Sequence, residues 1–192
     1  MKYYRWLGEI TGVEFPTLDY KERWWMVECS PVDDWDGQMT GTYAPKRVGL
    51  KSREPQFNFG IALNSWPIFS SELKDFLERQ APDHIQFLPF PLRVGRWRPR
   101  ILTGYYVGQF LRLVECLDRK RTAVRDNCWE PVNKSGDFDI RSPVVLDTAA
   151  IGDEKLFRVF GYRLYTVIRE DLKDAIERHG FAPQRFDLME TS

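Results

Sequence analysis

The chain has 192 residues, 28 acidic and 28 basic side chains, and therefore a formal net charge of zero at pH 7. Apolar residues make up 43% of the chain, which is enough for a hydrophobic core and excludes a disordered protein. No apolar run approaches the roughly 18 residues of a membrane-spanning helix, and Met1 is not followed by a secretory signal, so we expect a cytoplasmic protein.

The charge is unevenly distributed along the chain. Residues 1–92 carry ten basic and thirteen acidic side chains, residues 93–125 nine and two, and residues 126–192 nine and thirteen. The middle segment is therefore basic, with a net charge of +7, between two acidic ends. This pattern is compatible with solvated faces and internal ion pairs, and also with a polar binding surface.

The N-terminal region is expected to consist of strands and loops. Tyr3 to Leu7 and Arg23 to Cys29 have the aromatic and β-branched composition of strands. Ser30 to Gly37 is an acidic loop rich in turn residues, and Gln56 to Leu63 alternates like a strand. Residues 1–65 form this region, and residues 66–192 form an α+β region that completes one compact unit.

One short phrase occurs twice. Ser71 to Arg79 returns ninety-nine positions later as Glu170 to Arg178, in a register that also aligns Phe87 with Phe186. Each copy has apolar residues at i, i+3 and i+4, acids in its first turns and an arginine at its end, which predicts a short amphipathic helix followed by a strand. Amphipathic helices resemble one another in general, so duplication and coincidence both stay open.

The remaining elements are strands and turns. Gly104 to Asp118 is the longest predicted strand, and three shorter strands follow at Val144–Asp147, Leu156–Phe160 and Arg163–Val167. Phe160, Gly161 and Tyr162 form a tight reversal. Several strands with only two helices predict an α+β fold with a mixed or antiparallel sheet, two short amphipathic helices and two repeated helix-strand units.

Residue types with catalytic or metal-binding chemistry are sparse. Cys29, Cys116 and Cys128 are far apart and odd in number, which indicates buried free thiols and neither a disulfide framework nor a zinc site. His84 and His179 lack metal-ligand spacing, and no nucleophile elbow, phosphate loop or dinucleotide fingerprint is present. We therefore expect no catalytic residue, no metal and no cofactor.

Two patches are candidates for binding a partner. They consist of Asp33, Asp34, Trp35 and Asp36 in one loop, and Arg96, Trp97 and Arg98 in another. The first would suit a basic partner such as a nuclease and the second an acidic partner, because each sets a tryptophan among charges of one sign. Either patch can equally be a solvated loop.

The order of several short segments resembles the eleventh immunity family of bacterial polymorphic toxin systems. The resemblance covers roughly residues 60 to 186. Its segments are Trp66 to Lys74 with the strand ending at Pro91, Tyr105-Tyr106-Val107 through Val114 to Asp118, Leu156-Phe157-Arg158, Leu164 to Val167 with Leu172-Lys173, and His179-Gly180.

The resemblance implies a cytoplasmic, non-enzymatic protein that binds and neutralises a cognate toxin and so protects the producing cell and its kin. Two alternatives come from the residues themselves. The basic segment 93–125 could bind nucleic acid, although no nucleic-acid-binding motif accompanies it. The carboxylate pairs Asp33 with Asp36 and Asp137 with Asp139 could serve an enzyme, although acids in polar loops are usually solvated.

Overall fold

The structure is a computed structural model, and it divides the chain into two compact units. The residues it describes are 1–7, 13–14, 46–50, 59–62, 66–89, 92–94, 100–133, 136–181 and 184–192. Unit 1 comprises Met1–Leu7 and Phe110–Ser192, and unit 2 comprises Gly8–Gln109. Within the described ranges, no helix is long and apolar enough to cross a membrane.

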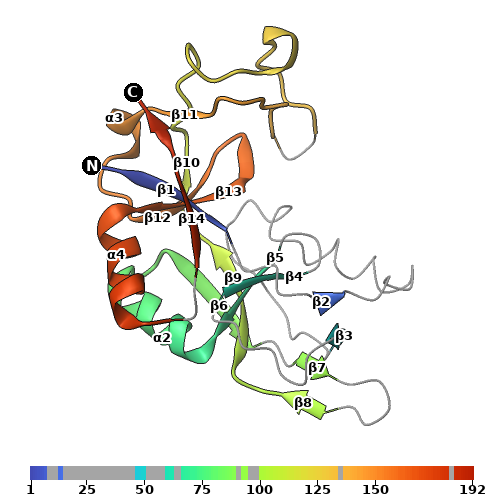
Figure 1. Cartoon of the computed structure of the whole chain (residues 1–192). Helices are drawn as coiled ribbons and strands as arrows, with labels where there is room; N and C mark the ends of the chain where they lie inside the picture. The colour runs from blue at the N-terminus through green and yellow to red at the C-terminus, as the bar shows by residue number, and fades with distance from the viewer. Residues whose placement is uncertain are drawn as a thin grey trace. The chain divides into compact units, whose positions relative to one another are not determined.

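A five-stranded mixed sheet forms the framework of unit 1 (Figure 1). In spatial order its strands are β10 (Leu113–Val114), β12 (Leu156–Val159), β13 (Tyr162–Arg169), β1 (Tyr3–Leu7) and β14 (Arg185–Leu188). β10 pairs with β12 in parallel, and the other neighbours are antiparallel. The N-terminal strand therefore lies between two strands from the C-terminal part of the chain.

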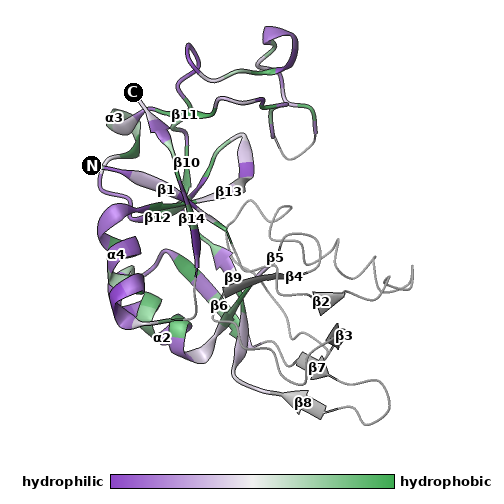
Figure 2. Ribbon diagram, viewed as in Figure 1, coloured by the Kyte–Doolittle hydropathy of each residue, from purple (hydrophilic) through white to green (hydrophobic). Residues whose placement is uncertain are grey.

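One core cluster of unit 1 lies on the face of this sheet that carries Phe157 and Val167, while Leu156 and Ile168 are buried on the opposite face. The buried residues of this cluster are Tyr3, Cys116, Leu146, Ile151, Phe157, Val159, Val167 and Met189. The helix α4 (Glu170–His179) packs against β13 and β1 and buries Leu172 and Ile176, each worth roughly 1.5 to 3 kcal/mol. Most other residues of α4 are hydrophilic, shown in purple in Figure 2, as the amphipathic pattern predicts.

Short elements complete unit 1. β11 (Val145–Leu146) pairs in parallel with β15 (Glu190–Thr191), and a 3₁₀ turn, η2, spans Arg125–Asn127. The four-residue helix α3 (Thr148–Ile151) begins after Asp147, whose carboxylate accepts a hydrogen bond from the Ala149 amide at 3.0 Å. This third helix was not expected from the sequence.

Two four-stranded sheets form unit 2. The first has the order β4 (Phe59–Ala62), β5 (Trp66–Ser70), β9 (Tyr105–Phe110) and β6 (Ile85–Pro89). The helix α2 (Ser71–Gln80) follows β5 and packs against it. The second sheet has the order β2 (Val13–Glu14), β3 (Lys46–Leu50), β7 (Leu92–Val94) and β8 (Arg100–Leu102).

The ends of the two repeated helices follow from local residues. The Ser70 hydroxyl accepts a hydrogen bond from the Leu73 amide at 3.3 Å and so caps the start of α2. Gly180 ends α4 in the left-handed conformation, with φ of 79°, which glycine adopts without a side-chain clash. The predicted helices and their limits are confirmed.

The repeated sequence segment corresponds to a strand-helix-strand arrangement that also occurs twice. α2 stands between β5 and β6, and α4 stands between β13 and β14. Phe69 of β5 pairs with Tyr106, and Ile168 of β13, ninety-nine positions after Phe69, pairs with Tyr4. β9 and β1 therefore occupy the same place in the two sheets. β9 lies between β5 and β6, which flank α2 in the sequence, and β1 lies between β13 and β14, which flank α4.

The α+β prediction is confirmed, but the predicted strand from Gly104 to Asp118 is wrong in its extent. β9 ends at Phe110 and β10 starts at Leu113. The strand is interrupted at this point because β9 pairs with β5 in one sheet, whereas β10 pairs with β12 in the other. The predicted strand at Arg23–Cys29 and loop at Ser30–Gly37 lie outside the described residues.

The prediction of buried thiols is only half right for the two described cysteines. Cys116 is buried in the core of unit 1, with 1% of its surface exposed. Cys128 is exposed because it follows η2 in a loop of unit 1. Cys29 lies outside the described residues.

Candidate functional site

The two predicted partner-binding patches lie outside the residues that the structure describes. They are Asp33, Asp34, Trp35, Asp36, Arg96, Trp97 and Arg98. Both patches therefore stay predictions.

Four arginines of the basic segment 93–125 contact other residues of the chain. The ion pairs are Arg112 with Glu154 at 3.9 Å, Arg119 with Glu115 at 2.9 Å and Arg125 with Asp139 at 3.0 Å. Arg121 also donates to the backbone carbonyl of Thr191 at 3.2 Å. Glu154 and Asp139 thus bring two acids from outside the segment to its arginines, whereas Glu115 is already counted in the net charge of +7.

The acidic pair Asp137 and Asp139 is bound by arginines. Arg163 donates to Asp137 from Nε at 3.1 Å and from Nη2 at 3.2 Å, and Asp139 pairs with Arg125 and Arg141. Burial alone would raise the pKa of Asp137, but the hydrogen bonds and charge of Arg163, with help from Asn133, outweigh it and lower the pKa. Asp137 is therefore held ionised, which suits a structural ion pair better than a general acid.

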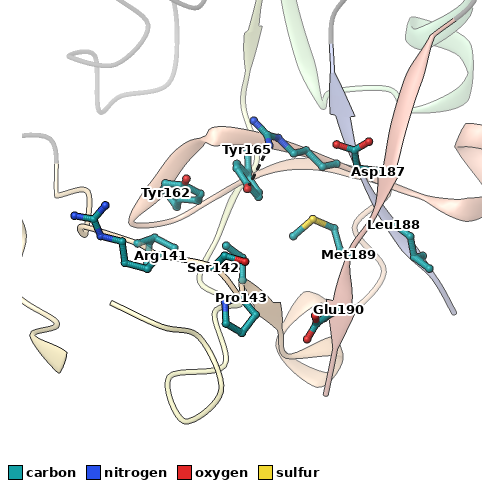
Figure 3. Close-up of a pocket in the computed structure, with 12 residues that line it drawn as sticks. Arg141, Ser142, Pro143, Tyr162, Tyr165, Asp187, Leu188, Met189 and Glu190 are labelled. Atoms are coloured by element: carbon teal, nitrogen blue, oxygen red, sulfur yellow. Dashed lines mark hydrogen bonds between the residues drawn. The ribbon is translucent and has the colours of Figure 1, made fainter. Parts of the chain in front are cut away.

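Unit 1 contains a hollow of about 380 Å³, hereafter the tyrosine hollow. Its lining residues are Arg5, Ile140, Arg141, Ser142, Pro143, Val144, Tyr162, Tyr165, Asp187, Leu188, Met189 and Glu190. Figure 3 shows Tyr162, Tyr165, Ser142 and Met189 around the same space. The volume lies within the range of about 300 to 1,000 Å³ that ligand pockets span.

Strand pairing brings the walls of the hollow together. β1 supplies Arg5 between β13, which carries Tyr165, and β14, which carries Asp187. The tight reversal at Gly161, with φ of 77°, precedes Tyr162 and leads the chain into β13. Residues 140–144 form the opposing wall, so the hollow joins segments that are far apart in the sequence.

Arg5 and two tyrosines are in direct contact in the hollow. The Arg5 guanidinium lies 4.0 Å from the centroid of the Tyr165 ring, and its Nη1 donates to the Tyr165 hydroxyl at 3.3 Å. The Tyr162 and Tyr165 rings are 4.5 Å apart. Burial, and next the neighbouring Tyr165, raise the pKa of Tyr162, so its hydroxyl stays neutral at physiological pH.

The lining residues of the hollow combine aromatic, charged and apolar side chains. They include no histidine, cysteine or lysine. Among the described residues of the whole chain, no three His, Cys, Asp or Glu side chains are placed to hold a metal ion. Tyrosine, arginine and methionine are instead the types that protein-protein interfaces concentrate.

Sequence reasoning missed this site. Its only signal along the chain is an arginine at position 5, in a strand that buries Tyr3 on one face and Trp6 on the other. Tyr162 and Tyr165 are three positions apart, so they do not fit the two-residue alternation of a regular strand. The pairing register between β12 and β13 shifts at this point, between Arg158 and Val159. The site depends on which strands lie side by side in the sheet, and the hydrophobic periodicity of the sequence does not reveal this.

These observations define an α+β protein with a hollow in unit 1 that is lined by tyrosine and arginine side chains. Residues 12–191 match the model of the immunity protein family Imm11. The match spans most of the chain, so the chain belongs to this family, and the resemblance seen from residue 60 to 186 is confirmed. No curated protein matches the chain.

Proposed function

We propose that the chain is a non-enzymatic, cytoplasmic immunity protein that binds a cognate toxin directly and neutralises it. Membership in the Imm11 family across residues 12–191 is the observation that carries this proposal. Binding of this kind protects the producing cell and its kin. It requires nanomolar affinity or better, because the toxin must be silenced at low concentration.

The surface chemistry of unit 1 supports a protein as the partner. The tyrosine hollow offers aromatic and arginine anchors of the kind on which interface energy concentrates. The ion pairs of Arg112 with Glu154 and of Arg125 with Asp139 balance two positive charges of the segment with acids from outside it, which leaves less charge for nucleic-acid phosphates than the sequence suggests. A protein partner is therefore the better supported choice over nucleic acid.

The test is affinity capture with the tagged full chain from its native cell lysate. The complex is washed at low and then high salt, bound proteins are identified by mass, and nucleic acid is measured by absorbance. We expect one stoichiometric protein that survives high salt and is toxic when expressed without the chain. Recovery of nucleic acid that leaves at high salt, with no protein partner, would contradict the proposal.

A further inference from the structure

Arg5 carries a charge that no acid neutralises in the part of the chain that the structure describes. Asp187 is its direct neighbour across β1 and β14, yet no ion pair joins them. Asp187 instead accepts from Arg185, with Oδ1 3.2 Å from Nε and Oδ2 3.3 Å from Nη2. Arg5 is left with the Tyr165 ring and hydroxyl, which occupy only part of its hydrogen-bonding capacity.

The repeated arrangement shows that the fold does not need an arginine at this place. Arg5 pairs with Val167, and in the equivalent place of the other sheet Val107 pairs with Ile68, ninety-nine positions before Val167. Val107 is fully buried, with 0% of its surface exposed. The equivalent position of the other sheet is therefore occupied by a buried valine. In unit 1 the same position is occupied by Arg5, which lines the tyrosine hollow.

The residues around Arg5 favour a ligand that carries a carboxylate. Arg141 lies at the wall of the hollow with its side chain 50% exposed, and the Tyr162 hydroxyl adds a neutral hydrogen-bonding group. Both oxygens of Asp187 already accept hydrogen bonds, which leaves Glu190 as the other carboxylate in the lining.

We propose that the tyrosine hollow receives an aspartate or glutamate side chain from a loop of the toxin, with Arg5 binding the carboxylate and Arg141 assisting from the wall. This inference rests on the proposed function. Arginine suits the task because its planar guanidinium can meet both oxygens of a carboxylate. The Tyr165 ring holds that guanidinium in place before the toxin arrives, which lowers the entropic cost of binding.

The test uses the full chain and, as the probe, the toxin recovered by affinity capture. Arg5→Gln and Arg141→Gln each remove one positive charge from the hollow, and Arg141→Gln also removes the exposed ion pair of Arg141 with Asp139 at 3.3 Å. Arg178→Gln, on the exposed end of α4, removes the same charge elsewhere in unit 1. We expect the Kd to rise at least tenfold for Arg5→Gln, severalfold for Arg141→Gln, and less than twofold for Arg178→Gln.

Carboxyl labelling gives an independent measurement on the toxin. In the complex with the wild-type chain, carbodiimide and glycinamide should leave one toxin aspartate or glutamate unmodified that reacts in the free toxin. The same residue should react again when Arg5→Gln is the partner. Thermal unfolding of each variant before the measurement separates lost binding from lost folding.

Two results would overturn this inference in different ways. If the toxin is captured and neutralised, but Arg5→Gln and Arg141→Gln both bind within twofold of wild type and no carboxylate is protected, the hollow is not the site and the proposed function stands. If the chain retains only nucleic acid, or no saturable protein partner at all, the proposed function and the acidic-loop site fall together.

Discussion

Lys74 in α2 and Lys173 in α4 occupy equivalent positions in the two repeated helices, ninety-nine residues apart. The Lys74 ammonium lies 5.9 Å from the centroid of the Phe87 ring and 5.2 Å from that of the Tyr106 ring. The Lys173 ammonium lies 5.6 Å from the centroid of the Phe186 ring and 5.1 Å from that of the Tyr4 ring. Each ammonium also pairs with the carboxylates one and four residues ahead in its helix. Each lysine therefore covers aromatic rings with its apolar stem and holds its charge at the helix surface.

The first prediction concerns this shared lysine. Lys173→Met keeps an unbranched apolar stem but loses the charge, so the cation-aromatic contacts and the ion pairs disappear. We expect the free energy of unfolding to fall by about 1 kcal/mol, and by a similar amount for Lys74→Met, when measured by urea denaturation. Lys120→Met is the control, because Lys120 is exposed. A loss no larger than that of Lys120→Met would contradict the role assigned to Lys173.

The second prediction concerns the reversal between β12 and β13. Gly161 has φ of 77°, and a Cβ at this position would overlap the Phe138 ring. Gly161→Ala should therefore lower the free energy of unfolding by about 2 to 4 kcal/mol, through backbone strain and overpacking together. Gly180→Ala is the matched control, because φ there is 79° but nothing lies within 4 Å of the added Cβ. We expect a loss of only about 1 kcal/mol for it, and equal losses at both positions would exclude the clash with Phe138.

The third prediction follows from the lowered pKa of Asp137. A carboxyl whose pKa is lower in the folded state stabilises the fold above its unfolded pKa of about 3.9, and this contribution is lost as the pH falls through the folded pKa. Asp137→Asn should cost about 2 kcal/mol at pH 7, since it leaves the largely buried Arg163 without its carboxylate.

Urea unfolding of wild type and Asp137→Asn between pH 7 and pH 3 measures this contribution. The gap between them should hold from pH 7 to pH 5 and shrink below about pH 4. Asp126→Asn serves as the control for an exposed aspartate and should change stability by less than about 0.5 kcal/mol throughout. A gap for Asp137→Asn that is independent of pH would show that its charge is not the stabilising feature.

The fourth prediction concerns the two described cysteines. Burial, and next the nearby Asp147 charge, raise the pKa of the Cys116 thiol to about 12, whereas Cys128 is exposed. Iodoacetamide at pH 8 should therefore modify Cys128 in the folded protein and leave Cys116 unmodified, as mapped by peptide mass. Both should react in guanidinium chloride. Rapid modification of Cys116 in the folded chain would contradict its place in the core.

The sequence could predict elements whose signal is local. The helix limits were predictable because Ser70 and Gly180 are capping residues, and the turn at Gly161 follows from its place between two apolar strands. The four-residue helix α3 is too short for a helical period to appear. Its only signals are Asp147 before it and Gly152 after it.

The tyrosine hollow could not be predicted, because its members are separated along the chain. Arg5 and Tyr165 are 160 positions apart and meet only because β1 enters the sheet between β13 and β14. Alternation within a strand tells which residues share a face, but it does not tell which strand lies alongside. The exchange of Val107 for Arg5 at equivalent positions becomes visible only once both strand registers are known.

The most direct test of the proposed neutralising function is a titration of the purified toxin's activity with the full chain, after affinity capture has identified the toxin. The account predicts that activity falls linearly and reaches zero at a fixed ratio of chain to toxin, because tight binding consumes each added molecule. Expression of the chain should also restore the growth of cells that express the toxin. Undiminished toxin activity at a large excess of folded chain would contradict the account.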